Sequence, residues 1–204
     1  MENKILITLL RHGRSQADDE GVHEGRYDSP LTELGREQVH KRAQDFLQRG
    51  FQFDLIIAST LQRANETARI IGSTLGTRVE DNPDWMEWDN GPLAGLPFDV
   101  AEERYPKPAF RTPYMPLAGT GESGWDIYSR AARVVQKLVQ RGPGFYLVVA
   151  HSGILNTALQ TMMGATPMVN PQGFAISFGD TGYVRLAYYP DQHRWMLLEF
   201  TSGE

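Results

Sequence analysis

The 204-residue sequence contains no cysteine, which excludes thiol nucleophiles, disulfide scaffolds, cysteine-ligated zinc and iron–sulfur clusters. It also lacks any apolar run near the roughly 20 residues that a membrane-spanning helix needs. The short apolar run at residues 5–10 is followed by the charged Arg11 and His12, not by the small residues of a signal-peptide cleavage site. We therefore expect a cytoplasmic protein that does not bind a membrane.

Positive charge is scarce as well, because 20 Lys and Arg residues against 25 Asp and Glu residues give a net charge of -5. Such a balance argues against a protein that coats nucleic acid, so we expect no nucleic-acid partner. An anionic ligand would have to be held by a local cluster of cations. The length and the 41% hydrophobic content fit one globular α/β domain over residues 1–204.

Strand and helix signals alternate along most of the chain. Apolar runs bounded by turn residues predict strands at 4–10, 54–58 and 145–150, and helical spacing of apolar residues predicts helices at 31–49, 60–75, 123–141 and 154–163. This alternation favours a mostly parallel central sheet flanked by helices. After Gly164, strand patterns at 174–178, 183–189 and 194–200 predict antiparallel hairpin strands added to one side of the sheet.

Residues 105–122 interrupt this alternation. They include Pro106, Pro108, Pro113 and Pro116, which is too much proline for a regular helix. A long irregular stretch inside a domain is usually functional, for example as a lid or a binding loop. We therefore predict that residues 105–122 form an ordered covering loop and not a linker.

Arginines and histidines recur at three strand-to-helix junctions. Arg11 and His12 follow the first predicted strand, Arg63 lies in the first helical turn after the second, and His151 follows the third. Ligands of open α/β sheets bind outside the carboxyl ends of the strands, where these side chains would converge with helix N-termini. Taken alone, each has an ordinary interpretation: Arg11 and His12 as a surface pair, Arg63 as a salt-bridge residue on a helix face, and His151 as a core histidine. Their recurrence favours an anion site, because a guanidinium grips two oxygens of a phosphate or carboxylate.

These junctions belong to a set of motifs that resembles the histidine phosphatase superfamily, whose best-known branch is cofactor-dependent phosphoglycerate mutase. In chain order the motifs lie at residues 9–15 (LLRHGRS), 28–35 (DSPLTELG), 59–68 (STLQRANETA), 85–96, 121–123 (GES) and 148–153 (VVAHSG). The Arg-His-Gly tripeptide alone is a weak signal, whereas the ordered set is highly specific. The resemblance implies a phosphoglycerate mutase-like three-layer sandwich, and the chain is most similar to the broad-specificity phosphatase branch.

The resemblance also implies roles for residues around the phosphoryl group. His12 would attack phosphorus and carry the phosphoryl group as a phosphohistidine, which splits one difficult displacement into two easier steps. It must then be neutral, and the backbone of Gly13 is the expected partner that fixes its tautomer. Arg11, Arg63 and His151 would hold the non-bridging oxygens, and His151 would do so best when protonated.

Glu87 would protonate the leaving oxygen and later take a proton from water. A carboxyl that starts protonated needs surroundings that disfavour its charged form, and Trp85 and Trp88 are placed in the sequence to supply apolar ones. These tryptophans can equally be core or lid residues. Asp84 and Asp89 are rival acids nearby, but only Glu87 aligns with the acidic position of the family. The resemblance implies no metal and no other cofactor.

The implied substrate-contact residues are Arg11, Ser15, Asp18, Glu24, Gly25, Arg63, Ser152 and Gly153. Two of them depart from the family pattern, since Asp18 and Glu24 stand where Asn and Gln are common. A carboxylate repels a phosphate unless it is protonated or paired, and Arg14 and Arg26 are the expected partners. A one-residue slip in the alignment would remove this departure. Asn156 also stands where many members have arginine.

The leading interpretation is a phosphomonoester hydrolase that acts on a small-molecule phosphomonoester through a phosphohistidine. A phosphoglycerate-type mutase is the nearest alternative, but dimeric mutases carry longer insertions between the regions of Glu87 and His151. A phosphate-ligand-binding regulator without turnover is the third. The presence of His12, Arg63, Glu87 and His151 together argues against it. The sequence leads to no prediction of the oligomeric state.

Overall fold

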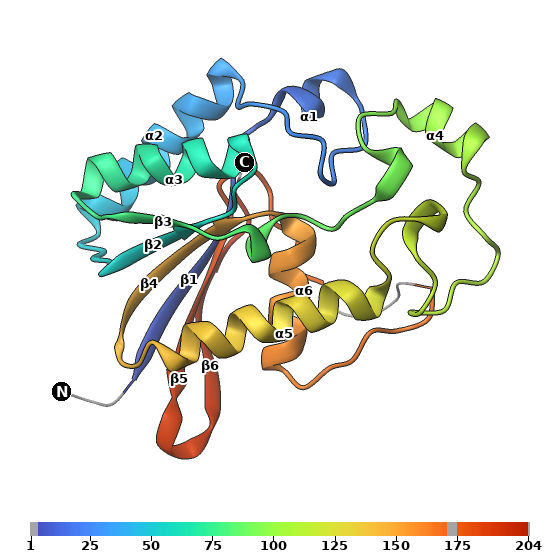
Figure 1. The fold of residues 1–204 in the computed structure, drawn as a ribbon. Helices are drawn as coiled ribbons and strands as arrows, with labels where there is room; N and C mark the ends of the chain where they lie inside the picture. The colour runs from blue at the N-terminus through green and yellow to red at the C-terminus, as the bar shows by residue number, and fades with distance from the viewer. Residues whose placement is uncertain (1–3, 171–174, 204) are drawn as a thin grey trace.

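The computed structural model describes residues 4–170 and 175–203, in which one sheet has six strands in the order β3-β2-β4-β1-β5-β6 (Figure 1). The strands are β1 Ile5–Arg11, β2 Leu55–Ala58, β3 Val79–Asp81, β4 Gly144–Ala150, β5 Tyr183–Tyr189 and β6 Arg194–Thr201. Strands β1 to β4 pair in parallel, whereas β5 and β6 continue the sheet beyond β1 in antiparallel fashion. This confirms the mostly parallel sheet with an antiparallel C-terminal hairpin.

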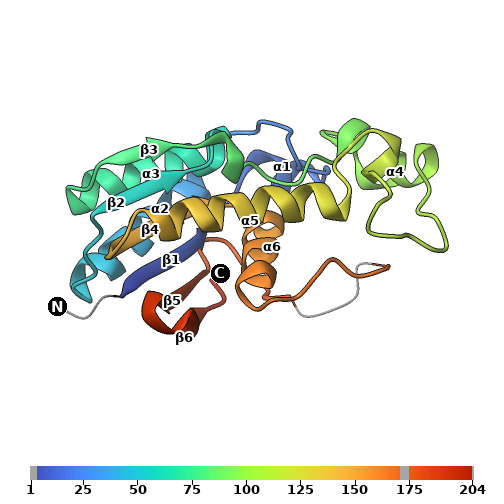
Figure 2. The same cartoon turned by 60° about the horizontal axis from the view of Figure 1, so that its bottom comes forward.

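Helices cover both faces of the sheet and make three layers (Figures 1 and 2). The longer α-helices are α2 Glu33–Gln48, α3 Gln62–Leu75, α5 Gly124–Gln140 and α6 Ser152–Met162, and the short ones are α1 Gln16–Glu20 and α4 Phe98–Arg104. Short 3-10 turns lie at Pro83–Trp85, Gly91–Leu93, Leu117–Gly119 and Pro190–Gln192. Helices α2 and α3 pack on one face of the sheet and α5 and α6 on the other, as the three-layer sandwich predicts.

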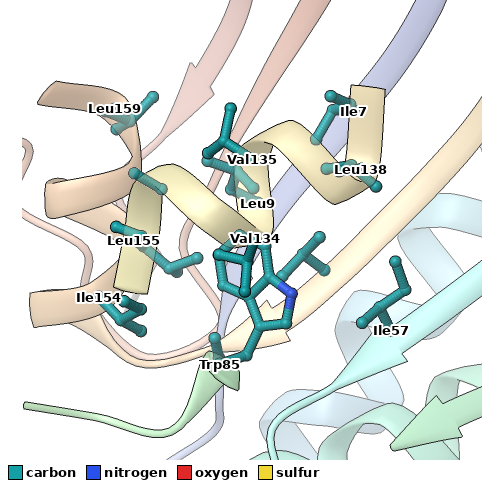
Figure 3. Packing of buried hydrophobic residues seen from close by; sticks show 14 of the residues in the cluster. Ile7, Leu9, Ile57, Trp85, Val134, Val135, Leu138, Ile154, Leu155 and Leu159 are labelled. Carbon is teal, nitrogen blue, oxygen red and sulfur yellow. The ribbon is translucent and has the colours of Figure 1, made fainter. Parts of the chain in front are cut away.

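Side-chain alternation along β1 fills a core on each face, because successive residues of a strand point to opposite sides. Ile7 and Leu9 belong to the same cluster as Val134 of α5 and Leu155 of α6 (Figure 3). Leu10 belongs to the cluster on the α2 and α3 side. All five side chains are buried, and burying each contributes about 1.5–3 kcal/mol. The two cores therefore fix the strand ends, where the predicted site lies.

Two parts of the secondary structure differ from the sequence prediction. Residues 175–178 do not form a strand, because the side chain of Asn156 binds Ile176 in place of a strand partner: Ile176 N donates to Oδ1 at 2.7 Å, and Nδ2 donates to Ile176 O at 3.0 Å. Residue 174 of that predicted strand lies outside the described residues. The sequence reading also missed β3, α1 and α4, which are too short for a clear periodic pattern.

Residues 105–122 run irregularly between α4 and α5, apart from the 3-10 turn near their end. Trp125 N of α5 donates a hydrogen bond to Pro113 O at 3.1 Å, and the Tyr114 ring stacks on the Trp125 ring with centroids 6.0 Å apart. The segment thus packs on the N-terminal end of α5, near the end of the sheet where β1 and β4 terminate (Figure 1). Its role as a cover of the site stays a prediction.

Candidate active site

The carboxyl ends of the parallel strands β1, β2 and β4 bring two predicted histidines together. His12 follows β1, Ser59 follows β2 and His151 follows β4. The main chain fixes these junctions, since His12 N donates to Ala150 O at 3.1 Å and Ser59 N donates to Val149 O at 3.0 Å. The two imidazole rings lie with their centroids 5.0 Å apart. Residues from distant parts of the sequence therefore meet at one end of the sheet.

His12 is buried, and its ring is oriented by the residue that follows it. Nδ1 lies 2.7 Å from the Gly13 carbonyl oxygen, so this nitrogen carries the proton and donates it. Nε2 is then an acceptor, and Arg63 Nε donates to it at 3.2 Å. Burial, followed by the charges of Arg63 and Arg11, holds the pKa of His12 well below its usual value. The neutral imidazole and the Gly13 contact are both as predicted.

The guanidiniums of Arg63 and Arg11 are fixed by backbone carbonyls. Arg63 is completely buried, and its Nη1 and Nη2 donate to Tyr27 O and Gly25 O, both at 2.9 Å. Arg11 Nη1 donates to Phe178 O at 3.1 Å. Gly25 therefore contributes a carbonyl that orients Arg63. Because both cations are positioned by the protein itself, they can meet an anion without reorganising.

His151 lies in a buried environment that disfavours its charged form in the free protein. Its Nε2 lies 2.8 Å from Ser59 Oγ, and its Nδ1 is buried without a hydrogen-bond partner among the described residues. Burial and the nearby charge of Arg63, with smaller contributions from His12 and Arg11, hold the pKa of His151 well below its usual value. The free protein therefore disfavours a protonated His151, because this imidazole shares its site with two guanidiniums. The negative charge of a bound phosphate would oppose the effect of these guanidiniums on the pKa of His151.

The surroundings of Glu87 also differ from those predicted. Its carboxylate accepts backbone N–H groups of Gly153 at 2.8 Å and Ile154 at 2.9 Å, at the start of α6, and that of Trp88 at 2.8 Å. These three donors, two of them at the N-terminus of α6, hold the carboxylate in place. Trp85 is buried in the core against α5 (Figure 3) and does not enclose the carboxylate in an apolar sleeve.

The N-terminus of α6 holds the other two residues predicted to contact the substrate. Gly153 N is already occupied by Glu87, and a Cβ at position 153 would overlap that carboxylate. Ser152 Oγ accepts a hydrogen bond from Asn156 Nδ2 at 3.4 Å, and Ser152 O accepts another at 3.0 Å. In the free protein these two residues therefore contact Glu87 and α6 itself.

Glu24 faces the acceptor nitrogen of His12. One carboxylate oxygen lies 3.3 Å from Arg63 Nε, the other lies 3.8 Å from His12 Nε2, and Ser15 Oγ donates a short hydrogen bond to the first. Burial raises the pKa of Glu24, although Arg63 and Ser15 partly offset this effect. The carboxyl thus occupies the side of His12 Nε2 where a phosphoryl group would have to approach.

Asp18 has a structural role that the sequence reading missed. It completes a capping box with Ser15 at the start of α1, and its other oxygen lies 3.5 Å from Arg11 Nη2. The predicted partner Arg14 is wrong, because Arg14 Nε pairs with Asp19 at 2.6 Å. The short helix α1 explains the difference, since it directs neighbouring carboxylates toward different arginines. The Ser-x-x-Asp spacing of the capping box was the signal available in the sequence.

Arg26, the second predicted partner, also pairs elsewhere. It lies 3.2 Å from Asp89 and 3.3 Å from Glu122 and holds the loop that carries Glu24 against the segment after Glu87. The prediction that Arg26 neutralises Asp18 or Glu24 is therefore wrong. The arginines that face those carboxylates are the ones predicted to hold the phosphoryl oxygens.

Arg130 of α5, which the sequence reading did not single out, holds the main chain around Glu87. Its buried guanidinium donates to the carbonyl oxygens of Asp84 at 2.9 Å, Met86 at 2.6 Å and Glu87 at 3.2 Å. It also pairs with the carboxylate of Glu122 at 2.6 Å. A single buried cation therefore fixes the segment that presents Glu87. Periodicity alone could not find it, because a charged residue on the inner face of α5 breaks the apolar pattern.

Asp180, in the turn before β5, is a second residue that the sequence reading missed. Its carboxylate lies 3.3 Å from Arg11 Nη1 and accepts a hydrogen bond from Gln38 Nε2 at 3.3 Å. The next residue, Thr181, donates its backbone N–H to His12 O at 3.1 Å. Burial raises the pKa of Asp180. The Gly-Asp-Thr-Gly sequence indicates a turn, but not that this turn returns to the end of β1.

Within residues 4–170 and 175–203, no group of three or more His, Asp and Glu side chains is arranged to hold a metal ion. Over the same ranges, none of the helices combines the length and the apolar character needed to cross a membrane.

Comparison with known proteins supports the resemblance that the motifs indicate. The profile of the histidine phosphatase superfamily (branch 1) matches residues 7–201. The chain is 28% identical over 162 residues to "uncharacterized phosphatase PhoE" of Bacillus subtilis (strain 168), covering 79% of each chain. It is 29% identical over 167 residues to "probable phosphoglycerate mutase GpmB" of Yersinia enterocolitica, covering 80% of this chain and 77% of that one. A solved structure of a mycobacterial glucosyl-3-phosphoglycerate phosphatase with VO3 is similar with a TM-score of 0.81 and 25% identity, over 98% of this chain and 100% of that one.

Proposed function

The chain belongs to the histidine phosphatase superfamily, and we propose that it hydrolyses small-molecule phosphomonoesters through a phosphohistidine on His12. The observation that carries this proposal is the state of the His12 ring. Gly13 O holds the proton on Nδ1, so that Nε2 presents its lone pair beside the Arg63 guanidinium. A neutral imidazole with one fixed tautomer next to a preformed anion site is what nucleophilic attack on phosphorus requires.

In the first step His12 Nε2 bonds to phosphorus while the bond from phosphorus to the alcohol oxygen breaks. Arg11 and Arg63 would neutralise the equatorial oxygens, and His151 would donate a further hydrogen bond to them. To bind the phosphoryl group, Arg63 Nε would exchange its present contacts with His12 and Glu24 for a phosphoryl oxygen.

Glu87 is the proposed proton donor to the leaving oxygen. Three backbone donors hold its carboxylate in the free protein, and the proposed role requires a proton on this group when the substrate is bound. A phosphomonoester monoanion brings such a proton, and an arriving dianion would also favour protonation of a neighbouring carboxylate. In the second step a water oxygen attacks phosphorus while the Glu87 carboxylate accepts a proton from that water. The bond between phosphorus and His12 Nε2 breaks, and inorganic phosphate is released.

The alternatives are a mutase and a phosphate-binding regulator without turnover. The resemblance to a probable phosphoglycerate mutase keeps the first of these open as a candidate. The short irregular segment 105–122 between Glu87 and His151 favours hydrolysis, since dimeric mutases carry longer insertions there. The carboxyl of Glu24 beside His12 is the feature that favours the regulator. A cytoplasmic location remains part of the proposal.

The test is hydrolysis of a chromogenic aryl phosphate with release of inorganic phosphate, followed by trapping of the phosphorylated protein. We expect acid-labile, base-stable phosphate on His12 and full activity in EDTA. Label on His151 would overturn the assignment of the nucleophile, and loss of activity in EDTA that a divalent ion restores would overturn the metal-free mechanism. Dependence on a bisphosphorylated primer without net phosphate release would establish the mutase. No turnover with any phosphomonoester would leave the regulator.

A further inference from the structure

A cavity of about 240 Å³ is lined in part by two residues whose backbone binds the Glu87 carboxylate. Trp88 and Gly153, whose backbone N–H groups bind that carboxylate, form part of its wall. The remaining wall comes from α5, from α6 and from the segment that follows α6. The cavity and the contacts of Glu87 therefore share two residues, Trp88 and Gly153.

The position of Glu87 relates this cavity to the proposed reaction. Glu87 would protonate the leaving oxygen, so the alcohol part of the substrate has to lie on its side of the phosphoryl group. The walls there are largely apolar, with Trp88, Ile127, Met163 and Met168. An apolar cavity of about 150 Å³ is enough to bind benzene, so this one has room for a substituted ring or a branched chain. The two methionines are more than half exposed, and their flexible side chains can adapt to such a group.

Arg111, in the irregular segment before α5, lies at the outer side of this cavity. It lines a small hollow that shares Trp88, Gly124 and Met168 with the larger cavity. The Arg111 main chain is held by Asn170, since Arg111 N donates to Asn170 Oδ1 at 2.6 Å and Asn170 N donates to Arg111 O at 2.8 Å. The position of Arg111 is thus set before a ligand binds.

The Arg111 side chain is charged, partly buried and without an acidic partner. Its guanidinium carbon lies 5.6 Å from the centre of the Trp88 ring, and no carboxylate of the described residues lies within ion-pair distance of it. By contrast, Arg26 and Arg130 both pair with Glu122. Burial lowers the pKa of Arg111, which reflects the cost of a partly desolvated cation. An anionic ligand would offset this cost.

We propose that the cavity binds the alcohol part of the substrate and that Arg111 binds a carboxylate at its outer end. The substrate class is then a phosphomonoester of a compact, mostly apolar alcohol that carries a carboxylate. This inference rests on the proposed function for the direction of the substrate. The bland alternative is that Arg111 only stacks on Trp88 and stabilises the segment.

Binding of non-hydrolysable phosphonates tests the inference separately from turnover. Benzylphosphonate is compared with 3- and 4-carboxybenzylphosphonate by calorimetry, in wild type and in Arg111→Gln, Arg111→Lys and the exposed control Arg133→Gln. We expect at least one carboxylated compound to bind wild type about tenfold tighter than benzylphosphonate. Arg111→Gln should lose this preference and keep its affinity for benzylphosphonate, Arg111→Lys should keep part of it, and Arg133→Gln should keep all of it.

Three results would overturn the inference. Wild type could show no preference for the carboxylated compounds, or Arg111→Gln could lose affinity for benzylphosphonate as much as for the carboxylated compounds. The third is that Arg133→Gln loses the carboxylate preference to the same extent as Arg111→Gln. The second would mean that Arg111 is structural, and a thermal melt of the variant would show the matching loss of stability. Hydrolysis of phenyl phosphate is measured beside the titrations. Absence of hydrolysis with the carboxylate preference intact would refute the proposed function and leave the Arg111 site standing. Hydrolysis of phenyl phosphate without any carboxylate preference would support the proposed function and refute the Arg111 site.

Discussion

The two halves of the site are held by the fold in different ways. The half proposed to bind the phosphoryl group, with His12, Arg63 and His151, is buried at the strand ends, and backbone carbonyls fix the imidazole of His12 and the guanidinium of Arg63. The leaving-group half lies around Glu87, on a segment without helix or strand that Arg130 holds by three carbonyl oxygens. Trp88 and Gly153, which bind the Glu87 carboxylate, also line a cavity with partly exposed walls.

In the proposed function, one half of the site binds the phosphoryl group that all substrates share, and the other half binds the alcohol part in which they differ. A buried anion site on strand ends suits any phosphomonoester, whereas irregular segments can change without disturbing the sheet. Damage to the phosphoryl half should therefore lower kcat/KM equally for all substrates. Damage to the leaving-group half should matter for phenyl phosphate, whose leaving oxygen needs a proton, and little for 2,4-dinitrophenyl phosphate, whose leaving group does not.

The largest effect is expected for His12→Ala. Without the imidazole no covalent intermediate forms, so kcat should fall by about 10⁴-fold or more with both substrates. Steady-state assays with phenyl and 2,4-dinitrophenyl phosphate check this, with His40→Ala on the exposed face of α2 as the control. A variant that retained a tenth of the activity would mean that another residue, or water itself, attacks phosphorus.

Arg63→Ala should follow, with kcat/KM lower by about 10²- to 10³-fold for both substrates, because one fixed donor to the phosphoryl oxygens is lost. The substitution also leaves Tyr27 O and Gly25 O without their donor, so urea unfolding is measured beside the kinetics. Arg69→Ala, on the exposed side of the same helix, is the control. A change below threefold in a folded variant would make Arg63 a structural residue only.

The sequence predicts the phosphoryl half better than the leaving-group half, and the reason is physical. His12 and His151 directly follow apolar strands, so a correct strand prediction also places them at one end of the sheet. Glu87 lies on a segment with no periodic pattern, and its environment depends on Gly153, which is 66 residues away in the chain. The sequence therefore leaves open whether the neighbouring tryptophans surround Glu87 or belong to the core, and the structure places Trp85 in the core.

The carboxylates around the site illustrate the same limit. The resemblance places Asp18 and Glu24 beside the phosphoryl group, and the sequence offers the nearby Arg14 and Arg26 as their partners. The structure pairs them with Arg11 and Arg63, because α1 and the loop after it fold back over the strand ends. Asp180 reaches Arg11 from the turn before β5, a contact that no local pattern reveals.

Arg130→Lys should have an intermediate effect that depends on the leaving group. Lysine keeps the charge opposite Glu122 but cannot bind three carbonyl oxygens at once, so the segment with Glu87 loses its fixed geometry. We expect kcat/KM to fall by about tenfold for phenyl phosphate and by less than about twofold for 2,4-dinitrophenyl phosphate. Arg133→Lys, exposed on the same helix, is the control. An equal fall with both substrates would contradict the division of the site into two halves.

The smallest effect is expected for Glu24→Gln, and it depends on pH. Burial raises the pKa of Glu24, so this carboxyl ionises at a higher pH in the folded protein than in the unfolded chain, and its charge then opposes a phosphate dianion next to His12. Glutamine keeps the shape and removes the charge. The single variant also leaves the capping box of α1 intact, which a change at Asp18 would not.

At a pH above the pKa of Glu24 in the folded protein, Glu24→Gln should lower KM by about threefold and raise the unfolding temperature, because the wild-type carboxylate destabilises the folded state there. Both differences should vanish as the pH falls toward the ordinary range of a glutamate, where wild type is protonated as well. KM and thermal melts between pH 5 and 8, with the exposed Glu37→Gln as the control, check the sign. A KM that rises in Glu24→Gln at high pH would mean that the carboxylate attracts a positive group of the substrate, and an amine-bearing phosphomonoester would then be the first compound to assay.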